Sequence, residues 1–339
     1  MNIKEIKDRW TTIEGEKKLK TIIRCLQKHT SFDECAEKID GRWDLRGIKL
    51  SEPQIKQYSI LNYSIKENEN ILEFKDVKLK NIDFSFSDLS YTTWIRCEFE
   101  NIKMLNTKAN YLKFWACSMK LSDIEKTDFQ NSLLGGRLEV NSGSFEDVKF
   151  KESKFNKTYY SFPLFKDCVF KNCNLTEVNF DGSRFEDCAF TGKLCSTIFR
   201  GITSHFEKQT FFEKKINPND FPNLMKNVDF TRAELNGVSF INGVDLSTCK
   251  LPALGDYLLV SNLAELFAEV KATITSEWGG EHMRIGLQVI DLIYYTNHHT
   301  NQKLEIVDKT FLIEQFGSDF AEKFYGLVKR INSKNELNK

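Results

Sequence analysis

An apolar residue returns at every fifth position through most of this chain. The first run begins at Phe74 and reaches Leu134, and after a one-residue slip near Val140 a second run extends from Phe145 to Phe190. A helix has a period of 3.6 residues and a strand a period of two, so neither element alone produces a period of five. The pattern therefore predicts a repeat architecture.

The position two residues before each apolar centre is constrained as well. Nearly all the residues there are small or β-branched and none is charged, as Ser87, Thr92 and Cys97 illustrate. Because positions two apart on an extended segment point to the same side, each five-residue unit buries one large and one small side chain. The chain must then bend after each unit and stack successive coils at the inter-strand spacing of ~4.8 Å.

Helical spacing replaces the repeat at the start of the chain. Apolar residues such as Ile6 and Trp10 predict helices within residues 1–42, and a capping box that begins at Ser31 predicts a further short helix to Ile39. A solenoid exposes an apolar cross-section at each end and needs a cap. We therefore expect residues 1–42 to form an N-terminal helical cap.

The repeat region extends over 43–251 and is followed by a different pattern. Residues 252–339 predict an α-helical domain of three or four amphipathic helices. Between about 202 and 225 the period is lost in an insertion that contains Phe211 and Phe212, and insertions of this length are often functional. We expect these two aromatic residues either to pack on the solenoid or to bind a partner.

Several units follow one motif: a small residue, then Asp or Asn, then Leu or Phe, then two variable residues. This motif resembles the pentapeptide-repeat family over about 74–200 and 226–251. The resemblance implies a right-handed four-sided β-helix with about 20 residues in each coil. It also implies that the C-terminal helices can pair two copies of the chain into a homodimer. The sequence does not decide between a homodimer and a monomer. The matching pairs are Asn174-Leu175, Asn179-Phe180, Asp229-Phe230 and Asp245-Leu246.

Composition indicates the cellular compartment and the state of the cysteines. The opening residues lack the apolar core of a signal peptide and no stretch is apolar enough to span a bilayer, which predicts a cytoplasmic protein without a membrane anchor. Six of the nine cysteines occupy the small inward position, so we expect packing residues rather than disulfides or metal ligands. They are Cys97, Cys117, Cys168, Cys173, Cys188 and Cys249.

Candidate catalytic motifs are missing from the sequence. The five histidines, among them the pair His298 and His299, do not follow the spacings of zinc sites. The chain has neither a phosphate-binding Gly-x-x-x-x-Gly-Lys-Ser motif nor a Gly-x-Ser-x-Gly nucleophile elbow. We therefore predict a protein that is not an enzyme and that needs no cofactor or metal.

The family resemblance also implies one specific activity, the binding of type II topoisomerases by mimicry of DNA. Such mimicry needs a strongly acidic surface, because DNA carries one negative charge per ~1.7 Å. Residues 71–200 contain 18 acidic and 19 basic side chains, and the whole chain contains 48 of each. This balance argues against mimicry, which we keep as the alternative, and against direct binding of nucleic acid.

Outward positions near the N-terminal end of the repeat carry apolar residues. With about 20 residues per coil, Ile71, Tyr91 and Tyr111 fall in one column, and Ile95 and Trp115 fall in a neighbouring column across one corner. A cluster that contains Trp and Tyr is typical of a protein-binding surface, unless terminal helices cover it. We therefore predict a non-enzymatic protein-binding scaffold of a bacterial cytoplasm. Three roles fit it: an adaptor, an immunity or defence component and, as the alternative, a topoisomerase-directed regulator.

Overall fold

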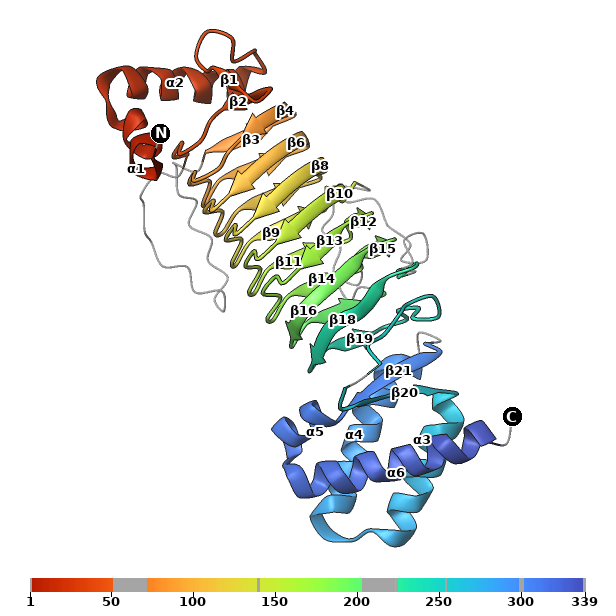
Figure 1. Ribbon diagram of the computed structural model, residues 1–339. Helices are drawn as coiled ribbons and strands as arrows, with labels where there is room; N and C mark the ends of the chain where they lie inside the picture. The colour runs from red at the N-terminus through yellow and green to blue at the C-terminus, as the bar shows by residue number, and fades with distance from the viewer. Residues whose placement is uncertain are drawn as a thin grey trace, which may run out of the picture. The chain divides into compact units, whose positions relative to one another are not determined.

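The computed structural model forms two compact units, Met1–Asn174 and Leu175–Lys339. Figure 1 labels most of the helices and strands of both units. The boundary between the units lies inside the repeat region of the sequence. The structure describes residues 2–50, 72–138, 141–202, 223, 225–253, 255–298 and 302–337.

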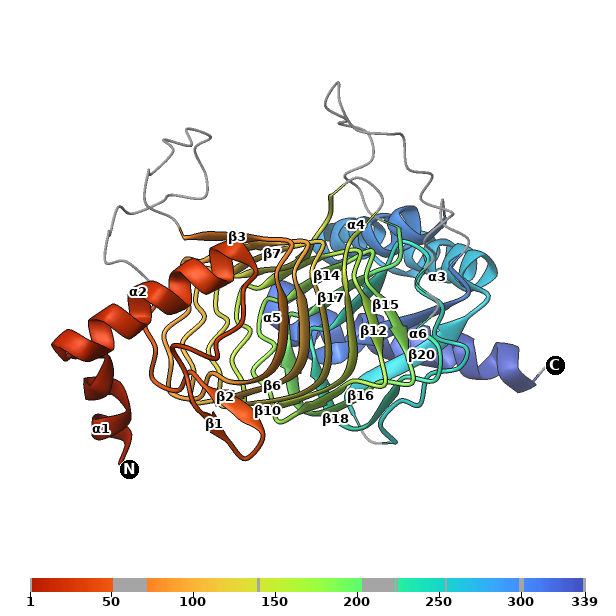
Figure 2. The ribbon, with the colours of Figure 1, turned by 90° about the horizontal axis from the view of Figure 1, so that it is seen from above.

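Helical segments open the first unit, as the sequence predicts. They are α1 (Ile3–Asp8), the 3-10 helix η1 (Arg9–Thr11) and α2 (Ile13–Lys28). The Thr12 hydroxyl accepts a hydrogen bond from the Gly15 N–H and so caps α2. Helix α2 buries Ile22 and Leu26 and lies beside strand β3 (Glu73–Lys75) (Figure 2).

The predicted short helix over 31–39 is wrong. Only a turn around Phe32 forms, and then β1 (Lys38–Ile39) pairs antiparallel with β2 (Arg42–Asp44). The Phe32 ring meets the Trp43 ring edge to face, with ring centroids 6.1 Å apart. Packing of these rings outweighs the local preference for a helix that the capping box indicates.

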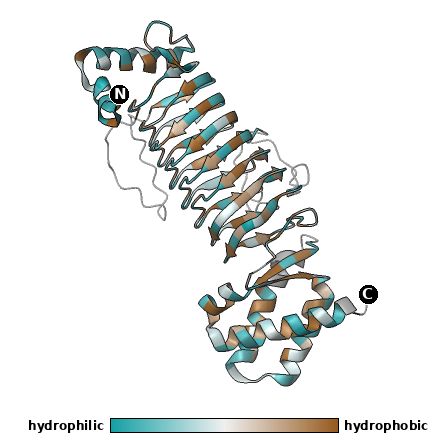
Figure 3. Cartoon of the chain, in the orientation of Figure 1, coloured by the Kyte–Doolittle hydropathy of each residue, from teal (hydrophilic) through white to brown (hydrophobic). Residues whose placement is uncertain are grey.

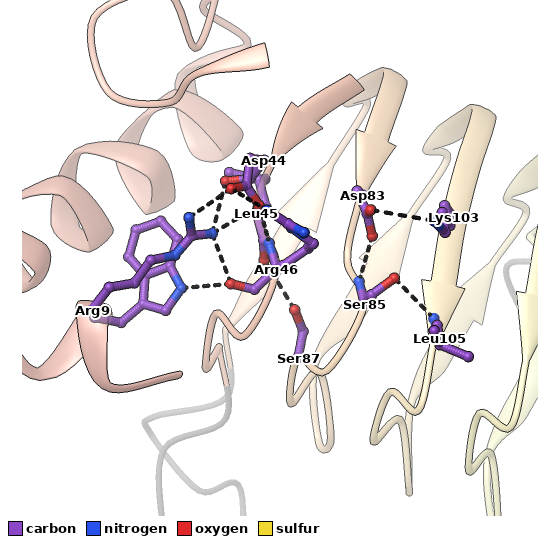
Figure 4. Close-up of polar contacts among 10 residues, drawn as sticks. Arg9, Asp44, Leu45, Arg46, Asp83, Ser85, Ser87, Lys103 and Leu105 are labelled. Carbon is purple, nitrogen blue, oxygen red and sulfur yellow. Dashed lines mark hydrogen bonds and ion pairs between the residues drawn. The ribbon is translucent and has the colours of Figure 1, made fainter. Parts of the chain in front are cut away.

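A buried carboxylate joins the helical segment to the first strands (Figure 4). Arg9 Nη1 lies 2.6 Å and Arg46 Nε 2.7 Å from the carboxylate oxygens of Asp44, which is 5% exposed. Trp10 Nε1 donates to the Arg46 carbonyl oxygen at 2.8 Å. Burial would raise the pKa of Asp44, but hydrogen bonds from Arg46 and Arg9 outweigh it and hold that pKa well below its usual range. The carboxylate therefore anchors the N-terminal cap in its charged form.

Two parallel ladders follow in the first unit (Figure 1). The short-strand sheet contains β3, β5 (Thr93–Ile95), β7 (Lys113–Trp115), β9 (Leu133–Gly136) and β11 (Tyr159–Ser161). The long-strand sheet of this unit contains the β1–β2 pair, β4 (Lys78–Asp83), β6 (Glu98–Leu105), β8 (Ser118–Glu125), β10 (Ser144–Lys151), β12 (Leu164–Lys166) and β13 (Val169–Lys171). Except for the β1–β2 pair, neighbouring strands run parallel.

The register repeats every 20 residues, as predicted, through most of this unit. Lys78 pairs with Glu98 and Glu98 with Ser118, and the side chain of Ser122 caps the backbone N–H of the residue 20 positions earlier. Between β8 and β10 the offset is 26 residues instead. The sequence predicts only a one-residue slip there. The structure corrects this prediction. One more five-residue repeat lies outside the ladder there, and Leu138 pairs with Asn141.

Most five-residue repeats end in a left-handed residue, which makes the predicted bend. The corner residues lie two positions after the apolar centres, and most are not glycine. Left-handed backbone costs an L-residue roughly 1–2 kcal/mol, and Asn and Asp tolerate it best. The first five of these corners are Asp76, Asn81, Phe86, Tyr91 and Arg96, with φ of 57°, 56°, 64°, 62° and 52°.

Inward side chains stack in register. Phe150 lies on Phe170 with ring centroids 4.8 Å apart, close to the spacing of neighbouring strands. Small inward hydroxyls satisfy backbone groups of adjacent turns, as when Thr107 Oγ1 donates to the Phe84 carbonyl oxygen at 2.9 Å. Along the strands, hydrophobic and hydrophilic residues alternate (Figure 3). Of the six inward cysteines, five are buried and Cys249 is half-buried, and all are free thiols.

The second unit begins with further parallel strands. They are β14 (Asn179–Asp181), β15 (Arg184–Glu186), β16 (Ala189–Cys195), β17 (Ile198–Arg200), β18 (Asp229–Asn236) and β19 (Ser239–Ile241). β14, β17 and β19 are successive neighbours, and β16 pairs with β18. Phe199 stacks on Phe240 at 5.0 Å, so the same interior packing recurs in this unit.

Helices and one small sheet complete the second unit. They are β20 (Tyr257–Ser261), α3 (Leu263–Glu277), α4 (Gly280–His298), β21 (Leu304–Asp308), α5 (Lys309–Phe316) and α6 (Ser318–Leu337). The sequence predicts the helices but not the antiparallel β20–β21 pair. None of the helices in the described part of the chain is both long and apolar enough to cross a bilayer.

Side chains of this helical region cap the last strands of the second unit. Gln302 Nε2 donates to the Phe240 carbonyl oxygen at 2.8 Å, and its Oε1 accepts from the Gly243 N–H at 3.1 Å. Asp308 Oδ2 accepts from the Gly237 N–H at 2.7 Å. These bonds satisfy backbone groups at the end of a ladder, where no further strand can do so.

Candidate protein-binding surface

Tyr91 and Tyr111 form an exposed stack at one corner of the first unit. Their rings are nearly parallel at 9°, with centroids 4.9 Å apart, and the side chains are 51% and 40% exposed. Both residues have left-handed backbone, with φ of 62° and 57°. Burial, the neighbouring Tyr111 and Asp88 raise the pKa of Tyr91. Tyr91 and Tyr111 of the predicted column therefore lie one above the other at the surface.

Ile95 and Trp115 also share a column, but neither is fully exposed. They are register partners in β5 and β7, and Trp115 has Gly136 of β9 as its next partner. A Cβ atom on Gly136 would lie 2.7 Å from the Trp115 ring, so the indole occupies the space that a larger residue would need. Trp115 is therefore only partly exposed at the outward position that the sequence predicts, because a glycine one turn away lets the ring pack down.

A third row separates the two predicted columns. Thr93, Lys113 and Leu133 are register partners on β5, β7 and β9, between the tyrosine corner and the Ile95–Trp115 column. The columns therefore flank one face instead of meeting across a corner. Lys113 is the one charged residue within these three strands. The 20-residue spacing from Lys113 could have placed Leu133 on this surface from the sequence.

The long-strand sheet presents the opposite chemistry. Glu100 lies between two lysines, 2.6 Å from Lys80 Nζ and 3.1 Å from Lys120 Nζ. Hydrogen bonds from these lysines lower the pKa of Glu100. On the same sheet Glu98 pairs with Lys78 and Asp83 with Lys103, at 3.1 and 3.9 Å. Lysines and carboxylates thus alternate from turn to turn and neutralise each other.

The remaining predicted residues cannot be placed on this surface. Phe211, Phe212 and Ile71 lie outside the described residues, as does most of the predicted 202–225 loop. Within the described part of the chain, no three His, Cys, Asp or Glu side chains gather closely enough to hold a metal ion. The candidate site is therefore the surface defined by Tyr91, Tyr111, Ile95, Trp115, Lys113 and Leu133, called the aromatic face below.

The stacked five-residue units define a class of repeat protein, and comparison with protein families agrees. The model for pentapeptide repeats matches residues 162–192, with 8 copies of the repeat. The match confirms that the chain contains pentapeptide repeats, as its sequence motif predicts. A search of curated proteins finds no match.

Solved structures similar to this chain include three pentapeptide-repeat or resistance proteins. Rfr23 from the cyanobacterium Cyanothece 51142 is 9% identical, with a TM-score of 0.31, over 34% of this chain and 89% of that protein. QnrB1, a plasmid-mediated fluoroquinolone resistance protein, is 14% identical, with a TM-score of 0.25, over 59% and 91%. HetL from Nostoc sp. strain PCC 7120, involved in heterocyst differentiation regulation, is 13% identical, with a TM-score of 0.20, over 53% and 83%.

Proposed function

We propose that this protein is a rigid, non-enzymatic scaffold that binds another protein through its aromatic face. In this proposal the five-residue units close into a right-handed four-sided β-helix. The scaffold acts in a bacterial cytoplasm as an adaptor or as an immunity or defence component. The exposed Tyr91–Tyr111 stack is the observation that carries the proposal.

The tyrosines are not needed for the turns that they occupy. Left-handed corners favour Asn, and Asn81, Asn101 and Asn106 fill such corners elsewhere in the same unit. A bulky aromatic residue at this position has a backbone cost, and half of its surface stays in water. Tyr is enriched among the residues that dominate binding energy at protein interfaces. Binding therefore explains the two tyrosines better than folding does.

The charge of the aromatic face indicates the kind of partner. Lys113 is the one charge on its three strands, and Asn110 and Gln130 lie beside the tyrosine corner, where their carbonyl groups accept the Tyr91 and Tyr111 N–H groups. Such a surface suits a protein with apolar anchors and few charges. The alternating ion pairs around Glu100 argue against mimicry of DNA, because its negative charge is already neutralised.

A double variant tests the proposal without disturbing the fold. Tyr91→Asn with Tyr111→Asn removes both rings and installs the residue that left-handed corners favour. We expect the melting temperature to stay close to that of the wild type. Affinity capture from bacterial lysate, followed by Kd measurement with the purified captured protein, should show at least tenfold weaker binding.

Leu121→Asn is the matched control. Leu121 is also a left-handed corner, with φ of 52°, and it is 53% exposed, but it lies on the long-strand sheet. Binding by this variant should equal that of the wild type. Equal binding by the double tyrosine variant would refute the proposal. Loss of a topoisomerase subunit from the double variant's captured proteins would instead identify the partner of the alternative function.

A further inference from the structure

Two cysteines outside the repeat approach each other in the N-terminal cap. Cys25 lies in the last turn of α2 and Cys35 in the segment before β1, and their Sγ atoms are 4.0 Å apart. Helix α2 ends at Lys28, and the left-handed backbone of the next residue, His29, turns the chain. The His29 N–H donates a hydrogen bond to the Cys25 carbonyl oxygen. The Phe32 carbonyl oxygen then accepts the Cys35 N–H at 2.9 Å. This backbone geometry returns Cys35 to the helix.

These thiols differ from the cysteines of the repeat. Cys97 and Cys168 are fully buried, and each Sγ donates to a backbone carbonyl oxygen of another strand at 3.4 Å. Cys25 is half-buried at the surface of the cap, whereas its neighbour Cys35 is only 5% exposed. Cys25 is therefore the residue of the pair that is more accessible to an oxidant in solution, and the Cys35 thiol lies beside it.

We propose that Cys25 and Cys35 form a redox-active dithiol that reduces a hydroperoxide and closes to a disulfide. The Cys25 thiol gives up its proton and its sulfur attacks one oxygen of hydrogen peroxide, the O–O bond breaks, and the departing hydroxide takes up the proton and leaves as water, so that Cys25 becomes a sulfenic acid. The Cys35 sulfur then attacks the Cys25 sulfur, and the sulfenic hydroxyl leaves with the Cys35 proton as a second water. Hydrogen peroxide is reduced by two electrons and the two thiols are oxidised by two.

The local environment assigns the order of these steps. Burial, the adjacent Cys25 thiol and the nearby Glu34 and Asp33 raise the pKa of Cys35 to about 12. Cys35 therefore stays protonated and protected near neutral pH, which suits a resolving thiol, and the more accessible Cys25 reacts first. A disulfide requires an S–S distance of about 2.05 Å, so the sulfurs must approach by about 2 Å. The proposed reaction therefore requires the short 30–37 connection to move.

The oxidised cap would be more tightly constrained than the reduced one. The disulfide would tie the end of α2 to the segment that leads into β1, and α2 packs beside β3 of the short-strand sheet. Closing this loop removes conformational freedom from the unfolded chain. We therefore expect a higher melting temperature for the peroxide-treated protein, reversed by dithiothreitol.

Peptide mapping of the full-length protein tests the proposal. Trypsin cleaves after Arg24, Lys28 and Lys38, so the disulfide would join the peptides Cys25–Lys28 and His29–Lys38. After mild hydrogen peroxide treatment and alkylation of free thiols, we expect two of the nine thiols to be lost and this linked pair to appear. The linked pair should disappear on dithiothreitol treatment.

Variants separate this chemistry from general oxidation. Cys25→Ser and Cys35→Ser should each abolish the linked peptides, and Cys35→Ser should leave Cys25 as a sulfenic acid that dimedone traps. Cys195→Ser is the matched control, because Cys195 is also half-buried but lies in the second unit, and its loss should leave the linked pair unchanged. Wild-type protein without the linked pair, or with Cys25 only as sulfinic acid, would overturn the proposal even if a variant failed to fold.

Discussion

The two sheets of the first unit share one backbone repeat but present different chemistry to solvent. On the long-strand sheet, Lys80, Glu100 and Lys120 follow one another at successive turns and form ion pairs. At the corner beside the short-strand sheet, Tyr91 stacks on Tyr111 of the next turn. A ladder brings identical positions together, so each outward column behaves as one chemical surface.

This difference teaches how a repeat fold separates stability from recognition. Aromatic rings pack against each other beneath both sheets, Phe150 on Phe170 under the long-strand sheet and Phe74 against Trp94 under the short-strand sheet, and this interior does not depend on which outward side chains lie above it. In a column of alternating charges, the lysines and carboxylates pair with each other, so few unpaired charges are left for a partner to bind. A column of tyrosines has no such internal partner beyond the stack, and its apolar surface stays available.

The largest effect should come from the shared interior. Phe150 is 2% exposed and stacks on Phe170, so Phe150→Ala removes a buried ring and leaves a cavity. We expect a loss of about 3–5 kcal/mol in the free energy of unfolding, measured by urea denaturation. Phe150→Leu keeps most of the buried volume and should lose clearly less. A loss below about 1 kcal/mol for the alanine variant would contradict the stacked interior.

The buried ion pair of the cap should come next. Asp44→Ala leaves the guanidinium groups of Arg9 and Arg46 without their carboxylate, but both are about a quarter exposed. We therefore expect about 2 kcal/mol of destabilisation, below the 3–5 kcal/mol typical of a fully buried pair. Asp44→Asn keeps the shape and some hydrogen bonds, and it should cost less.

The same carboxylate makes stability depend on pH in a stated direction. The pKa of Asp44 is lower in the folded protein than in the unfolded chain, where it is about 3.9. Its contribution is therefore complete above pH 5 and is lost as the pH falls below 4 towards the folded pKa. Melting curves of wild type and Asp44→Asn should converge as the pH is lowered from 7 to 3. A constant difference between them would contradict this role.

The period of five predicted much of the fold because one backbone rule repeats. The apolar centres from Phe74 to Phe190 and the bends between them follow from local chain geometry, and the helices at both ends follow from their 3.6-residue spacing. The β1–β2 and β20–β21 pairs escaped prediction. Each strand is at most five residues long, too short for alternation to be distinguished from a turn or a helix end.

The candidate surface was only partly predictable for a related reason. The spacing of 20 residues places Tyr91 over Tyr111, and the structure stacks them. It could not show that Trp115 packs into the space over Gly136, because that contact depends on shape as well as register. The Cys25–Cys35 contact likewise depends on a turn around Phe32, where the sequence favours a helix.

The smallest effect on stability should come from a change in the charged columns of the long-strand sheet. Glu100→Gln removes the carboxylate between Lys80 and Lys120, all of them partly or well exposed. Exposed ion pairs contribute little and are screened by salt, so we expect a slight fall in melting temperature at low ionic strength that disappears near 1 M salt. Binding of the partner should not change, because this sheet lies apart from the tyrosine corner in the register. A loss of binding equal to that of the double tyrosine variant would show that the two surfaces act together, and the separation of stability from recognition argued here would fail.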